Sequence, residues 1–391
     1  MRHTAASHVI IPEPAGGELA LPPAVLVDSP RAFEQMLSEL AGEQAIALDT
    51  ESDSLYRYFY KVCLIQVSTR RSDYLVDPLR LSDLTPLGSF LADPAVEKVF
   101  HAAENDILLL KRDFGFAFAN VFDTMLAARI LGWPQVGLAN LLDRHFGIVL
   151  DKRAQLTDWG QRPLSPAQLS YARLDSHYLL DLRDLLAREL RGRRRWREAQ
   201  EAFRALPDIA YVEKPFDPEG FWRLRGARTL QPHELAVLRE VYLWRDEQAR
   251  QLNRPPFKVL GDDVIVLLSQ RQPRRLEDLP LSVRQVASFG RSLLAAIARG
   301  RSAPPPRPPR PQPGNGRPDP LVQDRFDRLR AWRAERARQR GVDADIVLTN
   351  DALMAIARSA PATLEELASL GVMGAWKVQE YGPALLQVLM S

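Results

Sequence analysis

The stretch AIALDTES, residues 45–52, starts with four apolar residues and continues into acids. Side chains alternate along a strand, so a strand here places Asp49 and Glu51 on one face, directly after a buried run. Two like charges side by side in a partly buried position are costly unless a cation or hydrogen-bond donors compensate them. Taken alone, the segment is explained more simply as a strand end with solvated acids.

The sequence around this stretch alternates between strand and helix patterns from about Val25 to Leu206. Such alternation predicts a layered α/β domain built around a sheet. The expected strands are 45–48, 62–67, 74–76 and 96–100, and the expected helices are 33–40, 107–112 and 124–130. A further helix, expected over residues 166–190, has Ser165 as N-cap, Pro166 in its first position and Gln168 completing a capping box.

Two more segments carry acids. In VFHAAENDILLLKRDFG (residues 99–115) a strand is expected to end near His101 and a helix to begin at Glu104–Asp106, where acids are common for dipole reasons alone. In the helix after Ser165, Tyr171 and Asp175 are four residues apart and share a face. An ordinary surface aspartate beside a half-buried tyrosine would give the same spacing.

The three segments together support a different interpretation. Carboxylates that converge from separate elements beside a sheet are what a pair of hard divalent cations requires. Two such ions about 4 Å apart stabilise the attacking and leaving oxygens of a phosphodiester displacement. The sequence contains no Walker loop, no HExxH and no GxSxG, so other common hydrolytic chemistries have no support.

The C-terminal half is helical in composition and internally repeated. Residues 302–320 hold nine prolines in nineteen residues, which predicts an extended linker. On either side of it, residues 243–265 and 331–353 align without gaps at an offset of 88, and the register pairs Trp244 with Trp332 and Asp263 with Asp351. The offset indicates a duplicated helical domain.

The bulk composition is that of a folded protein without a membrane segment. The chain has 391 residues, which is too many for one hydrophobic core. It has one cysteine, Cys63, and neither an apolar run long enough to cross a membrane nor a signal-peptide core, so a cytoplasmic location is expected. The net charge is only +3, but arginines gather at residues 188–197 and 302–340, either as solvated faces or as nucleic-acid contacts.

At the acidic segments the sequence resembles the DEDD superfamily of exonucleases, in its tyrosine-containing branch. The motifs are Asp49-Thr50-Glu51, the run from His101 to Asp106, and Tyr171 with Asp175. DKRAQLTDWGQRPLSPAQLSYARLD, residues 151–175, is similar to the ribonuclease D family, and the duplicated units resemble HRDC domains. The resemblance implies a ribonuclease H-like α/β exonuclease domain followed by two small all-α domains.

The family pattern also implies roles for particular residues. Asp49, Glu51, Asp106 and Asp175 would hold two divalent cations, Mg²⁺ or Mn²⁺, with Asp49 bridging them and Asp106 acting through water. Tyr171 would orient the attacking water or help to deprotonate it, and mainly the former, because a tyrosine with an ordinary pKa of about 10 is a poor base. The product would be a nucleoside 5′-monophosphate from the 3′ end.

Substrate contacts are expected near these motifs, from Thr50, Gln66, His101, Asn105, Trp159 and Arg162. For Trp159 and Arg162, packing of the loop before the capped helix is an equal alternative. Aromatics at residues 56–60 are interpreted either as stacking surfaces for a base or as packing residues. Asp123 is expected to orient backbone near the site.

The resemblance implies an exoribonuclease that trims RNA 3′ ends, such as those of tRNA precursors, and works as a monomer. The HRDC-like units are expected to grip RNA or, alternatively, protein. A DNA 3′→5′ exonuclease and a catalytically silent nucleic-acid-binding protein remain alternatives. The second unit has GVDA where the first has NRPP (residues 253–256). The expected domain plan is a tail (1–24), the exonuclease domain (25–206), a linker (207–220), the first HRDC-like domain (221–301), the proline-rich linker (302–320) and the second HRDC-like domain (321–391).

Overall fold

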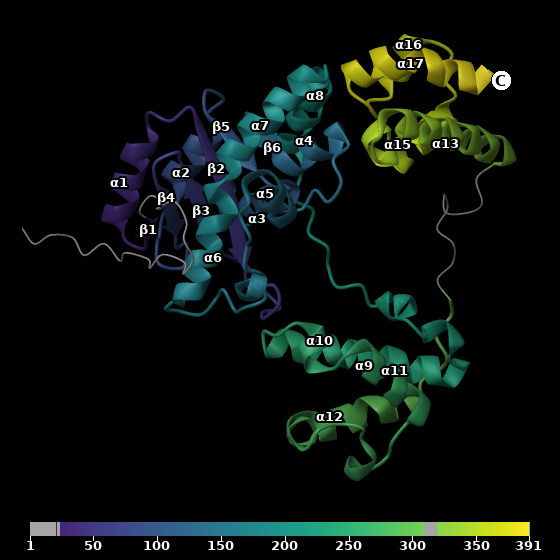
Figure 1. The fold of residues 1–391 in the computed structure, drawn as a ribbon. Coiled ribbons are helices and arrows are strands. Elements are labelled where there is room, and N and C mark those ends of the chain that lie inside the picture. The colour runs from purple at the N-terminus through teal and green to yellow at the C-terminus, as the bar shows by residue number, and fades with distance from the viewer. Residues whose placement is uncertain (1–20, 22–23, 309–318, 391) are drawn as a thin grey trace, which may run out of the picture. The chain divides into compact units, whose positions relative to one another are not determined.

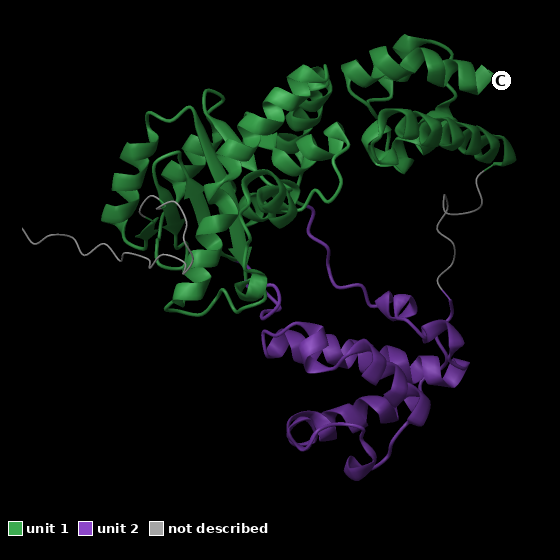
Figure 2. Cartoon of the chain, in the orientation of Figure 1, with its two compact units in different colours: residues 1–52, 62–211, 317–391 green, residues 53–61, 212–316 purple. Residues whose placement is uncertain are grey.

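The computed structural model describes residues 21, 24–308 and 319–390. The chain divides into two compact units (Figure 2). Unit 1 comprises residues 1–52, 62–211 and 317–391, and unit 2 comprises residues 53–61 and 212–316. Most of the expected N-terminal tail and the central part of the proline-rich linker lie outside the described residues.

Unit 1 contains a mixed six-stranded sheet in the order β1-β4-β3-β2-β5-β6 (Figure 1). The pairs β2–β3 and β3–β4 are antiparallel, whereas β1–β4, β2–β5 and β5–β6 are parallel. Every residue of β3 is buried, as expected for a central strand that is covered on both faces. The α/β class predicted from the sequence is confirmed, with strands β1 Ala24–Val27, β2 Ala45–Ser52, β3 Val62–Ser68, β4 Asp73–Val76, β5 Glu97–Phe100 and β6 Val121–Asp123.

Helices of unit 1 pack on this sheet through apolar faces of helical period. In α1, for example, Phe33, Met36 and Leu40 are buried in the main core. The capping box predicted at Ser165 and Gln168 is present, so the chain enters α6 where the sequence indicated. The helices of this part are α1 Pro30–Leu40, α2 Thr85–Ala92, α3 Glu104–Phe114, α4 Thr124–Leu131, α5 Leu138–Phe146, α6 Pro166–His177, α7 Leu179–Gly192 and α8 Trp196–Ala205, with 3₁₀ turns Lys152–Ala154 and Leu206–Asp208.

The prediction of one continuous helix over residues 166–190 is wrong at one point. The chain leaves helical geometry at Tyr178 (φ −91°, ψ 2°), and α7 begins at the next residue. Arg173 and His177 both bind the buried carboxylate of Asp73 in β4, at 2.8 and 3.0 Å, which ties the end of α6 to the sheet. Since leucines continue at helical spacing on both sides of Tyr178, the sequence pattern carried no sign of the break.

The duplication is visible in the structure as well as in the sequence. In one copy, Arg245 donates to the Leu260 carbonyl; in the other, Arg333 donates to the Leu348 carbonyl, 88 residues further on. The copies consist of α9 Pro232–Gln251, α10 Pro256–Val259, α11 Asp262–Arg271 and α12 Val283–Ser302, and of α13 Pro320–Arg340, α14 Ala344–Val347, α15 Asn350–Ser359, α16 Leu364–Ser369 and α17 Ala375–Met390; 3₁₀ turns Gly220–Arg223, Ala227–Thr229 and Leu276–Asp278 accompany the first.

None of the described helices is long and apolar enough to cross a membrane.

Candidate active site

Three of the predicted carboxylates meet beside the sheet. Asp49 and Glu51 project from β2, and Asp175 reaches them from α6. One ligand oxygen from each lies within 4.8 Å of the other two, and this is the one such group of three or more potential metal ligands in the described part of the chain. The sheet and the capped helix therefore bring the first and third motifs together.

The second motif reaches the same place through Thr50. Asp106 lies in the first turn of α3, is 7% exposed, and accepts a hydrogen bond from the Thr50 hydroxyl in β2. It does not belong to the 4.8 Å group formed by the other three acids. The predicted DEDD set is thus assembled as a triad, with Asp106 joined to it by Thr50.

The electrostatics of this cluster are strongly unfavourable to four ionised acids. Burial, followed by repulsion from the neighbouring acids, raises the pKa of Asp49 well above its ordinary value and that of Glu51 to about 9. Burial also raises the pKa of Asp106 and of Asp175 to about 7. A cation between them would offset the desolvation cost and screen the repulsion.

The donor set fits a hard divalent cation. All four side chains offer carboxylate oxygens, which Mg²⁺ and Mn²⁺ prefer, and neither histidine nor cysteine is among the grouped ligands.

Tyr171 lies one helical turn before Asp175 and is hydrogen-bonded to it. Burial, and then the charge of Asp175, raises the pKa of the Tyr171 hydroxyl far above its ordinary value, so the group stays protonated. Tyr171 also lines a cavity of about 670 Å³, which is bounded by α6 and by residues 148–157. None of the four carboxylates lines this cavity, so Tyr171 is the one predicted catalytic residue that contacts it.

Sequence reasoning missed Lys152, whose charge lowers the pKa of Asp175. The residue is exposed and lies in the 3₁₀ turn Lys152–Ala154 next to the cavity. Its signal was the basic pair in DKRAQL, to which no role had been given.

The segment before Asp106 is held by Asp123, as expected. Its carboxylate accepts hydrogen bonds from the backbone N–H groups of Ala102 and Ala103, at 3.1 and 2.8 Å, and it also caps α4. His101 lies beside it with Nδ1 2.9 Å from the Thr124 hydroxyl, and burial lowers its pKa to about 4. Asn105 is exposed at the start of α3.

Other expected substrate contacts lie inside the protein. Gln66 is fully buried in β3, paired in register with Asp49, and neither polar atom of its side chain has a hydrogen-bond partner. Trp159 is 1% exposed and packs in a small core with Leu169. Arg162 donates to Asp77 and to the Cys63 carbonyl. Trp159 and Arg162 thus have the packing contacts considered as the alternative.

Two of the aromatics after the first motif are engaged within unit 2. The Tyr58 hydroxyl donates to Asp246 at 2.8 Å, and the Lys258 ammonium lies 3.5 Å from the centre of the Tyr56 ring. These contacts match the packing alternative for the two tyrosines.

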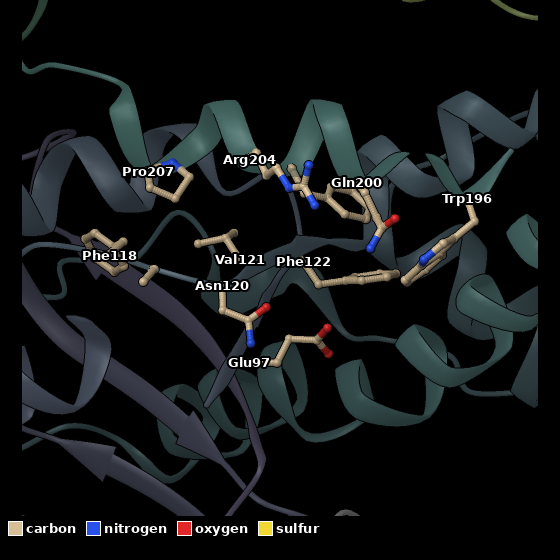
Figure 3. A pocket seen from close by; sticks show the side chains of 11 residues that line it. Glu97, Phe118, Asn120, Val121, Phe122, Trp196, Gln200, Arg204 and Pro207 are labelled. Atoms are coloured by element: carbon tan, nitrogen blue, oxygen red, sulfur yellow. The ribbon is translucent and has the colours of Figure 1, made fainter. Parts of the chain in front are cut away.

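A second cavity, of about 380 Å³, lies at the β6 edge under α8 (Figure 3). Phe122, Trp196 and Arg204 contribute to its walls. None of the four carboxylates lines it, so it belongs to a different part of the surface.

Comparisons with known proteins agree with this geometry. A family model described as 3′-5′ exonuclease matches residues 24–191, and the HRDC domain model matches residues 234–297 and 322–389. The ribonuclease D of Acidiphilium cryptum is 31% identical over 384 residues, which cover 94% of both chains. That of Gluconacetobacter diazotrophicus is 33% identical over 313 residues, covering 76% of this chain and 77% of the relative.

Larger eukaryotic proteins match over part of their length. The exosome complex component 10 homolog of Caenorhabditis elegans is 34% identical over 257 residues, which cover 64% of this chain and 29% of that protein. The chain spans about a third of the length of the first curated relatives it matches. Among solved structures, the catalytic core of RRP6 from Trypanosoma brucei has a TM-score of 0.67 at 29% identity, covering 73% of this chain and 82% of that one.

Proposed function

Because the chain belongs to the ribonuclease D family, we propose that it is a metal-dependent 3′→5′ exoribonuclease. The observation that carries the proposal is the convergence of Asp49, Glu51 and Asp175, with Asp106 held beside them by Thr50. The names of the relatives support RNA over DNA as substrate. Trimming of tRNA precursors, a monomeric state and a cytoplasmic location belong to the same proposal.

The four carboxylates would hold two cations, Mg²⁺ or Mn²⁺. When bound, such ions lower the pKa of water and neutralise charge on the scissile phosphate and the leaving oxygen. Asp49, Glu51 and Asp175 would hold the cation that supplies the attacking water, and Asp106 would assist in holding the second.

The chain's own groups would position the reactants. The Tyr171 hydroxyl, whose pKa burial raises, donates to Asp175 and would hold the attacking water in line. Thr50 fixes the carboxylate of Asp106. Asp123 fixes the backbone before Asp106, so the second motif enters the site in one orientation.

The domain plan is part of the proposal. We place the exonuclease activity in residues 25–206 and the two HRDC-like domains in residues 221–301 and 321–391, with connections at 207–220 and 302–320. The matches to the two family models fall inside these limits, apart from residue 24.

The test follows a 5′-labelled single-stranded RNA with a short 3′ tail in Mg²⁺, Mn²⁺ or EDTA. The wild type should give a ladder that shortens from the 3′ end, and both EDTA and Asp49→Ala should abolish it. Glu34→Ala, an exposed acid on α1, is the matched control and should leave the ladder intact. A DNA oligonucleotide of the same sequence should be degraded more slowly.

Two results would replace the proposal. Equal or faster degradation of the DNA would favour a DNA exonuclease. Retained RNA binding without hydrolysis in any metal would favour a silent binding protein.

A further inference from the structure

The two HRDC-like copies differ in charge. Residues 221–301 carry fifteen Arg and Lys against eight Asp and Glu, whereas residues 321–391 carry nine of each. Thirteen of the fifteen bases in the first copy are exposed. The replacement of NRPP by GVDA left a changed role open for the second copy, and the charge surplus belongs to the first copy alone.

The first copy has an open cavity with cationic walls. Its volume is about 390 Å³, and no acid is among the residues that line it: Gln248, Leu252, Arg254, Lys258, Val259, Arg284, Gln285, Ser288 and Phe289. Arg254 and Arg284 are exposed. Cations, amides and an aromatic ring around one hollow are the groups that hold phosphates and stack bases of a single strand.

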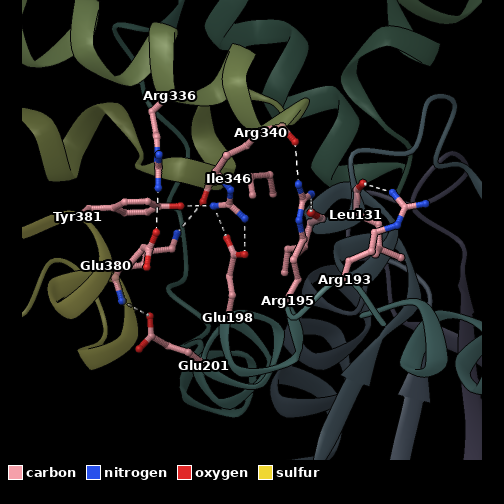
Figure 4. A network of polar contacts seen from close by, with 12 residues as sticks. Leu131, Arg193, Arg195, Glu198, Glu201, Arg336, Arg340, Ile346, Glu380 and Tyr381 are labelled. Atoms are coloured by element: carbon pink, nitrogen blue, oxygen red, sulfur yellow. Dashed lines mark hydrogen bonds and ion pairs between the residues drawn. The ribbon is translucent and has the colours of Figure 1, made fainter. Parts of the chain in front are cut away.

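The duplication identifies the same face in the second copy. At the offset of 88, Leu252, Arg254 and Lys258 are replaced by Arg340, Val342 and Ile346. In the last helix the offset is 92, because the ring pair Trp244–Phe289 corresponds to Trp332–Tyr381, so Arg284 and Gln285 are replaced by Trp376 and Lys377. Figure 4 shows this face against α8 of the same unit. Val342 and Ile346 pack into the main core of the α/β domain, so the face is covered.

The polar groups against the covered face include two carboxylates of α8 and the Arg195 guanidinium, which donates to the Arg340 carbonyl. The carboxylate of Glu198, 1% exposed, forms an ion pair with Arg340 (Figure 4). The carboxylate of Glu201 accepts from the backbone N–H groups of Trp376 and Lys377 at the start of α17, at 2.5 and 3.3 Å. In the second copy this face is therefore held by two carboxylates of α8.

We propose that the corresponding open face of the first copy is the RNA-binding surface of the chain, with Arg254 and Arg284 on phosphates of a single strand and Phe289 against a base. In the second copy the same face is buried against the α/β domain, so RNA does not bind there. The inference rests on the proposed function only for the identity of the polyanion. Residues 53–61, which follow the acidic strand β2 directly in the chain, pack on this copy at Asn253, next in sequence to Arg254.

The test measures binding of a fluorescent single-stranded RNA by the full chain in EDTA, at several salt concentrations. Arg254→Ala/Arg284→Ala should weaken binding roughly tenfold or more, as the loss of two charged hydrogen bonds would. It should also lower the slope of log K against log salt by about 1.4, since each phosphate contact on a single strand contributes about 0.7. Arg271→Ala/Arg274→Ala removes two exposed arginines of the same copy that do not line the cavity, and should change neither quantity appreciably.

The outcomes separate this inference from the proposed function. Metal-dependent hydrolysis of a trinucleotide should be the same in the wild type and in Arg254→Ala/Arg284→Ala, because the carboxylates are untouched. If RNA binding is unchanged in that variant, or falls equally in the control, the inference is overturned while the exonuclease stands. If the wild type binds polyglutamate in preference to RNA, the face takes an acidic protein and the inference is likewise overturned. If RNA binding is lost in the variant but the wild type hydrolyses nothing, the inference stands and the exonuclease falls.

Discussion

Replacing Glu198 by glutamine should release the second HRDC-like copy from the α/β domain. Glu198 is 1% exposed and its partner Arg340 is 12% exposed, so the substitution leaves a buried guanidinium without its counter-charge. Breaking a buried pair in this way costs about 3–5 kcal/mol. At about 1.4 kcal/mol for each factor of ten, even the lower figure shifts the docking equilibrium more than a hundredfold toward the undocked state.

The backbone N–H groups of Trp376 and Lys377 report this docking directly. They lie in the first turn of α17, where no carbonyl of the same helix can accept from them, and Glu201 of α8 accepts instead. Hydrogen exchange of the segment 375–381 should therefore accelerate in Glu198→Gln. Removing both charges, in Glu198→Gln/Arg340→Met, should restore part of the protection, because no unpaired ion is then buried.

Arg129→Gln is the matched control for this experiment. Arg129 also joins the α/β domain to the second copy, through Asp345, but the two side chains are 25% and 53% exposed. A pair of this exposure contributes about 0.2–1 kcal/mol, so exchange in the 375–381 segment should change little. Exchange in Glu198→Gln that is no faster than in Arg129→Gln would refute the assignment of the docking energy to the buried pair.

Three further predictions concern the carboxylate site. Because the folded pKa values of Asp106 and Asp175 (about 7) and Glu51 (about 9) lie above their ordinary values, the metal-free fold binds more protons than the unfolded chain between about pH 4 and 9. Its Tm in EDTA should therefore fall from pH 5 to pH 8, and Mg²⁺ should raise it most at pH 8; a Tm that rises with pH in EDTA would contradict the buried cluster. Tyr171→Phe should lower kcat about a hundredfold by misplacing the attacking water, with Mg²⁺ affinity by calorimetry unchanged; equal loss of metal affinity would make Tyr171 a support for Asp175 only. Gln66→Met should stabilise the metal-free protein against urea by about 1 kcal/mol or more, because it removes two buried polar atoms without partners, and destabilisation would mean that the amide is satisfied in solution.

The acidic motifs were predictable because each lies on an element with a strong local signal. Strand alternation placed Asp49 and Glu51 on one face, and the capping box at Ser165 fixed the phase of the helix that carries Asp175. The order of the motifs then matched a known family. Their convergence followed from the resemblance rather than from any spacing in the sequence.

Other features depend on contacts between distant residues and left no local trace. The end of α6 at Tyr178 is set by Asp73, about a hundred residues earlier. Trp159 and Arg162 belong to a motif-like run, yet their partners are core side chains and Asp77. The different environments of the two repeated faces depend on Glu198 and Glu201 of α8, and the sequence carries no local signal for either contact.

The contact between Glu201 and α17 also affects how the protein can be dissected. A helix whose first turn is completed by a side chain from another part of the molecule is not self-sufficient, and the second copy expressed alone would begin α17 with two unpaired N–H groups and an exposed Trp376. The first copy has its own cap, since Ser282 and Gln285 close the start of α12 within the copy. The two repeats, alike in sequence, should therefore differ when each is expressed alone. The first copy should fold as an independent domain, whereas the second should lose its fold without the α/β domain.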